Sequence, residues 1–325
     1  MTLRPDIKNI VGGPCLLLAL LAFSVMPAAA QNPYPNRPIR VVIQFAPGGS
    51  DVVARILCQK MGESLAQPFV IDNRPGAAGV IGANIVAKAA PDGYTTLFAT
   101  ASFAVTAAFA RPLPYDTMRD FDAIGFIGSQ PFLLVLHPSV QAQSVKDYIA
   151  LSRVKPLNFA SAGSGGIGHL SQELFHHLVG VKATHVPYKG TGPMATALLA
   201  GEVPSAFINI SGSWPHVRAG RLKALGVTSA KHTAFAPDLP TLAESGVAGF
   251  ESGTWYGLTS PRGTPATAIH VLNREIVAAL KTDTRDKIAG LGVELAPSSP
   301  KEFTDYMRAE IAKWSKIIKV AGISE

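Results

Sequence analysis

The stretch Val41–Arg55 constrains the fold more than any other, because it joins a buried strand to a helix through two adjacent glycines. Its first residues are apolar and mostly β-branched, which predicts a short buried strand ending at Pro47. Ser50 and Asp51, both favourable N-cap residues, then precede apolar residues at helical spacing. Such a turn points backbone N–H groups outward at the positive end of a helix, so it predicts a binding site for an anion such as a carboxylate.

The alternation of strand and helix continues to about residue 102. A strand at Pro68–Asp72 leads through a glycine-containing turn to a helix at about Val80–Ala89. The next strand, Thr95–Ala99, runs into Thr100 and Ser102. Right-handed crossovers place such strands in a parallel sheet with its turns at one edge. Ligands of parallel sheets bind beyond the carboxyl ends of the strands, where these turns fall.

A second region repeats the pattern after Phe121–Pro138, which we interpret as two extended stretches that carry the chain out of the first region. Ser144 is predicted to cap a helix through about Ser152, and the strand Leu157–Ser161 runs into the glycine-rich turn Ala162–Gly168. The other elements predicted in this region are helices at His169–Val179 and near Met194–Ala200, and strands at Ala183–Val186, Ser205–Ile210 and Lys223–Thr228.

The chain is then predicted to return to the first region. Thr254–Leu258 is an aromatic, extended second crossing, Pro265 opens a helix to about Lys281, and Ser299 caps a final amphipathic helix. Two crossing strands make a hinge, so we expect an α/β fold of two lobes, each a mostly parallel sheet flanked by helices. The expected boundaries are residues 31–132 plus 254–325 for the first domain and 133–253 for the second.

The first thirty residues are expected to lie outside this fold. Arg4 and Lys8 precede an apolar run over residues 11–26, and three alanines ending at Ala30 offer a cleavage site, so residues 1–30 are predicted to be a secretory signal peptide. A membrane anchor is the weaker interpretation because the apolar run is short. Export of a large chain that needs no disulfides predicts a protein of the bacterial periplasm.

Composition narrows the class of partner. The net charge of +7 falls to +6 without Arg4, Lys8 and Asp6 (+2 and −1), and the basic residues are scattered rather than interleaved with aromatics. This pattern predicts a solvated surface that favours acidic ligands and no nucleic-acid partner. Cys58 is the one cysteine beyond the signal peptide and is predicted to be a buried thiol.

Motifs for cofactor or enzyme chemistry are missing from the glycine-rich turns. Ala162–Gly168 has neither the spacing of a dinucleotide fingerprint nor the Gly-Lys-Ser/Thr ending of a phosphate loop. Ser161 and Ser164 do not lie in Gly-x-Ser-x-Gly, and His169 and His176 lack the acidic partner of a zinc-binding helix. We therefore expect no cofactor, no metal and no catalytic residue.

Two further residues carry open alternatives. His169, in the first turn of a helix that begins at the cleft, either touches a ligand or is a surface histidine. Asn209, near the end of a strand that points to the cleft, either donates to a carboxylate or forms a buried turn. The aromatic residues Trp255, Tyr256 and Trp314 are interpreted as core or hinge packing.

Several motifs are similar to those of one family, and the similarity runs from about Tyr34 to Ile323. The chain resembles the periplasmic solute-binding proteins of tripartite tricarboxylate transporters, often called Bug proteins. The most specific motifs are Asn73-Arg74-Pro75-Gly76-Ala77, Ala89-Ala90-Pro91-Asp92-Gly93-Tyr94, Thr184-His185-Val186-Pro187-Tyr188-Lys189-Gly190 and Pro261-Arg262-Gly263-Thr264-Pro265.

This resemblance implies a type II-like periplasmic binding protein fold, a small carboxylate ligand, and delivery to a membrane permease of one large and one small subunit. It also implies that the turns Phe45–Ser50 and Ser161–Ser164 hold the carboxylate. Together with the strand ends, the candidate ligand-binding residues are Phe45, Ala46, Pro47, Gly48, Gly49, Ser50, Thr100, Ser102, Ser161, Ala162, Gly163, Ser164, His169 and Asn209.

The chain departs from the family pattern in two places. One residue, Ser50, separates Pro-Gly-Gly from Asp51 where the family has two, and Pro204 stands where the family has an aspartate.

The leading hypothesis is a monomeric, non-enzymatic receptor for an organic acid. The alternatives are a secreted hydrolase that uses a serine of the Ser161–Ser164 turn, and a ligand-sensing adaptor for a sensor kinase. Monocarboxylates, dicarboxylates, tricarboxylates and aromatic acids all fit turns that read one carboxylate group.

Overall fold

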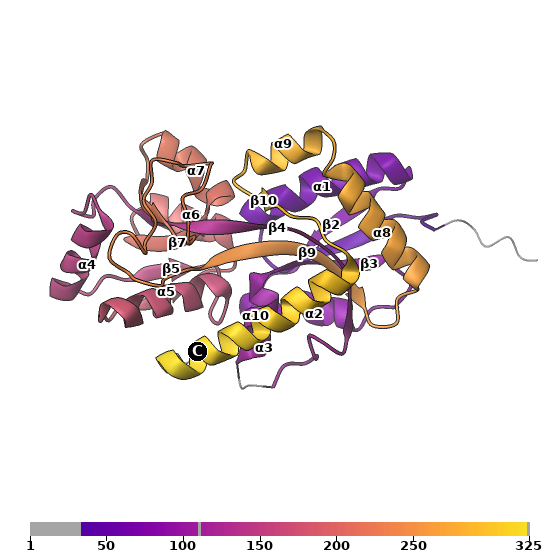
Figure 1. The fold of residues 1–325 in the computed structure, drawn as a ribbon, viewed down its shortest axis with the longest axis horizontal. Helices are drawn as coiled ribbons and strands as arrows, with labels where there is room; N and C mark the ends of the chain where they lie inside the picture. Colours follow the sequence, from indigo (N-terminus) through magenta and orange to yellow (C-terminus); the bar gives the residue numbers. More distant parts are fainter. Residues whose placement is uncertain (1–33, 110–111, 324–325) are drawn as a thin grey trace, which may run out of the picture. The chain divides into compact units, whose positions relative to one another are not determined.

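The computed structural model describes residues 34–109 and 112–323 (Figure 1). The predicted signal peptide, residues 1–30, and its cleavage after Ala30 lie outside the described residues. Within the described part of the chain, no helix has both the length and the apolar character needed to cross a membrane.

The first part of the chain forms a parallel unit in which β1 (Ile39–Ile43) lies between β2 (Phe69–Asn73) and β3 (Thr95–Thr100). Val41 and Val42 are both fully buried although they point to opposite faces, because α1 (Gly49–Leu65) covers one face, and α2 (Val80–Ala87) and α3 (Ala101–Ala108) contribute to the core on the other. A short 3₁₀ helix, Ala77–Gly79, precedes α2. The predicted βαβ pattern is confirmed.

The prediction that Ser50 and Asp51 cap the first helix is wrong. α1 begins at Gly49 with Gly48 as its N-cap, and Ser50 and Asp51 lie in its first turn. The Asp51 carboxylate accepts a hydrogen bond from Arg55 Nε at 2.7 Å, which is the i,i+4 spacing of helical ion pairs. The first turn of α1 therefore has no side-chain cap.

β4 (Phe121–Leu136) is one continuous strand, where the sequence predicted two extended stretches. Its pairing register with the neighbouring strand shifts next to Gly125 and Gly128, so the glycines are absorbed as bulges instead of breaking the strand. The first two thirds of β4 pair with β9 (Gly253–Pro261), and its last residues pair with β7 (Ser205–Asn209) and β8 (Lys223–Val227). β4 therefore carries the sheet from the first lobe into the second.

The second lobe has the same strand-to-helix arrangement as the first. β5 (Phe159–Ser161) lies between β6 (His185–Pro187) and β7, and all three are parallel. Ser144 caps α4 with a complete capping box, as predicted. The helices of this lobe are α4 (Val145–Val154), α5 (Ile167–Val179), α6 (Thr191–Leu199) and α7 (Ile210–Arg218).

The chain returns through β9, which is antiparallel to both β3 and β4. It then forms α8 (Ala266–Ala279), α9 (Asp283–Ala289), β10 (Glu294–Leu295) and α10 (Pro300–Ala321). α10 packs against α3 and β4 and makes a smaller contact with α5, as can be followed in Figure 1. The predicted α/β class is confirmed, with parallel strands outside and antiparallel strands at the centre of the sheet.

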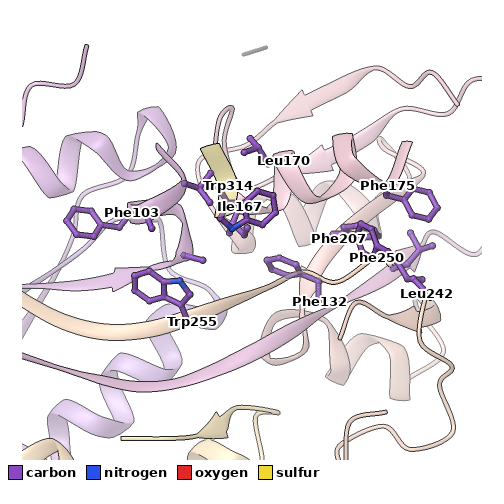
Figure 2. Close-up of a cluster of buried hydrophobic side chains, with 14 of the residues drawn as sticks. Phe103, Phe132, Ile167, Leu170, Phe175, Phe207, Leu242, Phe250, Trp255 and Trp314 are labelled. Atoms are coloured by element: carbon purple, nitrogen blue, oxygen red, sulfur yellow. The ribbon is translucent and has the colours of Figure 1, made fainter. Parts of the chain in front are cut away.

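One hydrophobic cluster runs through both lobes (Figure 2). It includes Phe103 and Trp255 from the first lobe, Phe207 from the second, and Phe132 on β4 where the sheet passes between them. Trp314 of α10 is 1% exposed and belongs to the same cluster, so the returning helix closes part of the core.

Candidate functional site

A cavity of about 50 Å³ lies between the two lobes, at the carboxyl ends of their parallel strands. Half of the candidate residues line it: Phe45, Ser50, Thr100, Ser102, Ala162, Gly163 and Asn209. The two turns predicted from the sequence therefore lie at the edge of the sheets where the cavity is found.

Four other candidates, Ala46, Pro47, Gly48 and Gly49, lie where the two lobes touch rather than on the cavity wall. The Ala46 N–H donates to the Lys189 carbonyl at 3.1 Å. A side chain on Gly48 would come within 3.2 Å of the Thr191 side chain, and one on Gly49 would overlap the side chain of Asn209. Glycines in this turn therefore let the two backbones approach closely.

The remaining candidates lie on or behind the turn of the second lobe. Ser164 is exposed, Ser161 is 1% exposed, and His169 is 4% exposed. The surface interpretation of His169 is therefore wrong, and His169 does not line the cavity either. Instead its Nδ1 accepts a hydrogen bond from the Gly165 N–H at 3.1 Å.

Five helices begin at this cavity, and none of the five has a side-chain cap. They are α1, α3, α5, α6 and α7, with N-caps Gly48, Thr100, Gly166, Gly190 and Asn209. Of the helices that begin away from the cavity, α4, α9 and α10 are capped by the side chains of Ser144, Thr282 and Ser299, whereas α2 and α8 have no side-chain cap. The first N–H groups of a helix have no partner inside it and carry partial positive charge, so five such ends around one cavity favour an anion.

Two buried polar atoms of the cavity-lining residues are unpaired. Thr100 Oγ1 and Asn209 Oδ1 have no hydrogen-bond partner among the described residues, and their residues are 3% and 5% exposed. Buried polar groups in folded proteins are nearly always paired, so these two indicate a site that a ligand or water completes.

The Asn209 amide is held from behind by a buried network. Its Nδ2 donates to the Tyr256 hydroxyl at 3.3 Å, and that hydroxyl donates to Gln130 Oε1 at 2.7 Å. Burial raises the pKa of Tyr256 to about 12, so the phenol keeps its proton and remains a donor. One amide hydrogen of Asn209 is left for a ligand.

The rest of the wall is apolar and uncharged. It includes Phe45, Phe132, Ile167 and Phe207, and none of the described residues that line the cavity is charged. An anion here would be held by hydrogen bonds and helix dipoles rather than by an ion pair.

Several residues of the cavity wall were not predicted from the sequence. Thr191 and Met194 follow the Lys189-Gly190 turn, whose strand β6 lies beside β5 and ends at the same edge, so strand order was the signal that could have located them. Tyr256 was interpreted as core or hinge packing and Thr254 as part of the second crossing, and both lie on β9 next to the cavity. Phe132 and Ile167 carry no motif.

Cys58 is a buried free thiol, as predicted, and burial raises its pKa to about 12, so it is unreactive at neutral pH. No group of three or more histidine, cysteine or acidic side chains in residues 34–109 and 112–323 is arranged to hold a metal ion.

Comparison with known proteins shows the family to which the chain belongs. Residues 53–323 match the family model described as the tripartite tricarboxylate transporter family receptor. The chain belongs to this family. The resemblance found in the sequence is confirmed. The protein is therefore a member of a family of periplasmic solute-binding receptors.

Named relatives of this receptor family are similar over almost their whole length. BugT of Bordetella pertussis is 34% identical over 94% of this chain and 97% of that one. A solved structure from R. palustris with adipate is 37% identical, with a TM-score of 0.86 over 90% of this chain and 99% of that one. MatC of Rhodopseudomonas palustris, solved with malate, is 32% identical, with a TM-score of 0.83 over 88% and 100%. These structures confirm the two-lobed periplasmic binding protein fold.

Replacing Thr100 by valine tests whether its hydroxyl is reserved for a ligand. Thr100→Val removes a buried, unpaired hydroxyl, so it should leave the ligand-free receptor equally stable or up to about 1 kcal/mol more stable. The matched control is Thr228→Val, because Thr228 Oγ1 accepts from the Phe132 N–H at 2.8 Å and donates to the Ser252 carbonyl at 2.7 Å. That change should cost about 1–3 kcal/mol in urea unfolding. Equal losses for both variants would show that the Thr100 hydroxyl is paired within the protein.

Proposed function

We propose that the protein captures a small organic acid between its lobes and delivers it to a tripartite tricarboxylate-type permease of one large and one small membrane subunit. The observation that carries this proposal is the set of five uncapped helix N-termini around a cavity built by both lobes. The moving units are residues 31–132 plus 254–325 and residues 133–253. The receptor works as a monomer in the periplasm after removal of residues 1–30.

The carboxylate of the ligand binds in the cavity, where the unpaired donors meet. It accepts from the Thr100 hydroxyl, from one amide hydrogen of Asn209 and from the first N–H groups of the five helices, apart from the Ile167 N–H, which already donates to Ser102 Oγ. The adipate and malate in the solved relatives support an organic acid as the ligand class. Monocarboxylates, tricarboxylates and aromatic acids belong to the same class and are part of the test.

Closure of the lobes makes hydrogen bonds that neither lobe makes alone. The Ile167 N–H at the start of α5 donates to Ser102 Oγ of the other lobe at 3.1 Å, and Ala46 bonds Lys189 across the same gap. The ligand and the bond from Ile167 together satisfy helix ends that would otherwise face solvent, and the bond from Ala46 joins the turn before α1 to the second lobe. Binding and closure are therefore coupled.

A hydrolase is the second candidate, because Ser161 Oγ lies 2.6 Å from His185 Nε2, as a nucleophile lies beside its base. The position of Ser161 argues against this function. The residue is 1% exposed, does not line the cavity, and its Oγ also lies 3.1 Å from the Gly163 carbonyl oxygen. We therefore assign Ser161 no catalytic role.

A thermal-shift screen tests the proposed function. The panel contains monocarboxylates, dicarboxylates, tricarboxylates, aromatic acids and neutral amides of the same shape. A true ligand at about a hundred times its dissociation constant adds about 2.7 kcal/mol of stability, which raises the unfolding midpoint by several degrees. Acids should stabilise and their amides should not. A panel in which acids and amides act alike, or in which an ester is hydrolysed with dependence on Ser161, would refute the proposal.

Blocking closure tests the coupling between the lobes. A methyl group at Gly192, near the start of α6, would overlap the Pro47 carbonyl oxygen of the other lobe. Gly192→Ala should therefore weaken binding of the best acid from the screen by roughly tenfold or more, about 1.4 kcal/mol, in calorimetric titration. Gly168→Ala is the control, because Gly168 also lines the cavity but its nearest neighbour, the Phe207 carbonyl oxygen, is 3.8 Å away.

Both substitutions place alanine in a helix, so both should raise intrinsic helix stability. Unchanged binding by Gly192→Ala would mean that the ligand does not need the closed arrangement.

A further inference from the structure

The turn between β5 and α5 rests on a pair of stacked histidines outside the cavity. The rings of His169, in the first turn of α5, and His185, on β6, have centroids 3.8 Å apart and planes 17° apart. Phe159 of β5 packs against both rings, with its centroid 5.0 Å from that of His185 and 6.1 Å from that of His169. The pair is therefore fixed between three elements of the second lobe.

Each imidazole bonds to one end of the turn that it supports. His185 Nε2 lies 2.6 Å from Ser161 Oγ, and this hydroxyl oxygen accepts the Gly163 N–H at 3.2 Å. His169 Nδ1 accepts the Gly165 N–H at 3.1 Å. Because Gly163 and Gly166 line the cavity, these bonds determine the shape of its wall.

The arrangement requires a neutral His169. A backbone N–H can only donate, so His169 Nδ1 must present its lone pair to Gly165, and the ring proton lies on Nε2, 3.6 Å from Glu173 Oε1. A second proton, on Nδ1, would set two N–H groups against each other and break the bond to the turn. It would also place a cation against the His185 ring.

We propose that His169 and His185 are positioning residues of the ligand site, and that as a neutral stacked pair they hold the turn Ser161–Gly166 in its binding shape. This role rests on the proposed function, because it describes how the wall of that site is maintained. Neither ring touches the cavity, so both act through the turn.

The charges around the pair favour the neutral state of His185. Burial, and then the neighbouring His169, lower the pKa of His185 to about 4. Burial lowers the pKa of His176, two turns beyond His169 on α5 and packed on Phe159, to about 4 as well. Glu173 opposes both effects, and its own pKa is lowered, mainly by His169. Outside the pair, Glu173 is the group whose charge acts on His185.

The sign of the pH effect follows from the lowered pKa of His185. Its folded pKa of about 4 lies below the ordinary histidine pKa of 6.5, so its contribution to the native turn is complete above pH 6.5. That contribution is lost as the pH falls from 6.5 through about 4.

Amide NMR of the ligand-free protein between pH 7 and about 4 tests the proposal without any ligand. The Gly163 and Gly165 amide signals should move with the same midpoint as the imidazole signals of His185, and that midpoint should lie below 6.5. Glycine signals that stay still while the His185 signals move would overturn the proposal.

Variants separate the hydrogen bonds from simple packing. His169→Asn keeps an acceptor at the position of Nδ1, and His185→Gln keeps a polar group at the position of Nε2. In the variant that combines His169→Asn with His185→Gln, the amide signals of Gly163 and Gly165 should no longer respond to pH. His169→Phe keeps a stacked ring without the acceptor. His232→Gln is the control, because His232 pairs with Glu244, which is not among the groups acting on the pair, and should leave the pH response of the two glycines unchanged.

Calorimetry with adipate and malate at pH 7.5 gives the functional result. His169→Phe should weaken binding roughly tenfold, the equivalent of one lost hydrogen bond, while His169→Asn and His232→Gln bind as the parent does. Equal affinity of His169→Phe and the parent would contradict the positioning role. If neither acid binds the parent, the proposed ligand class fails for these acids, and the NMR titration still decides the role of the pair.

Discussion

Backbone N–H groups at the start of a helix need a partner, and in this receptor five helices leave theirs facing one cavity. Side chains cap α4, α9 and α10, which begin away from this cavity, whereas α2 and α8 begin away from it with no side-chain cap. The unpaired Thr100 hydroxyl and the Asn209 amide oxygen are at the same cavity. An anion shared by both lobes can accept hydrogen bonds from the helix N–H groups and from the Thr100 hydroxyl that meet at this cavity.

The sheet explains why the five helix ends converge. Parallel strands end at one edge, and β4 continues from the first lobe into the second, which turns the two edges toward one another. Glycines occupy the places where the two edges touch. Gly48, Gly49 and Gly192 let the two backbones come into contact, and any larger residue at these positions would push them apart. The glycine turns therefore serve close approach of the lobes as much as direct contact with a ligand.

The sequence predicted most of the strands and both glycine turns, because apolar β-branched runs ending at glycine have few alternatives. It did not predict α3, which follows β3 without a turn residue, or α7, which contains Pro215. Local pattern also could not show that Pro47–Gly49 meets Lys189–Gly192, or that the second turn meets Ser102, because such contacts depend on strand order. The sequence placed His169 in the first turn of the helix that follows the glycine-rich turn. It could not show that His169 stacks on His185, which is sixteen residues away on β6.

The central claim is that a carboxylate binds the uncapped helix ends, and a titration of ¹⁵N-labelled protein with the stabilising acid tests it most directly. The account predicts that the first-turn amide signals of α1, α3, α5, α6 and α7 move together as the acid is added. The first-turn signals of α4, α9 and α10 should remain in place, because side chains already cap those helices. Movement at the capped helices, or binding that leaves the five uncapped ends unchanged, would contradict the account.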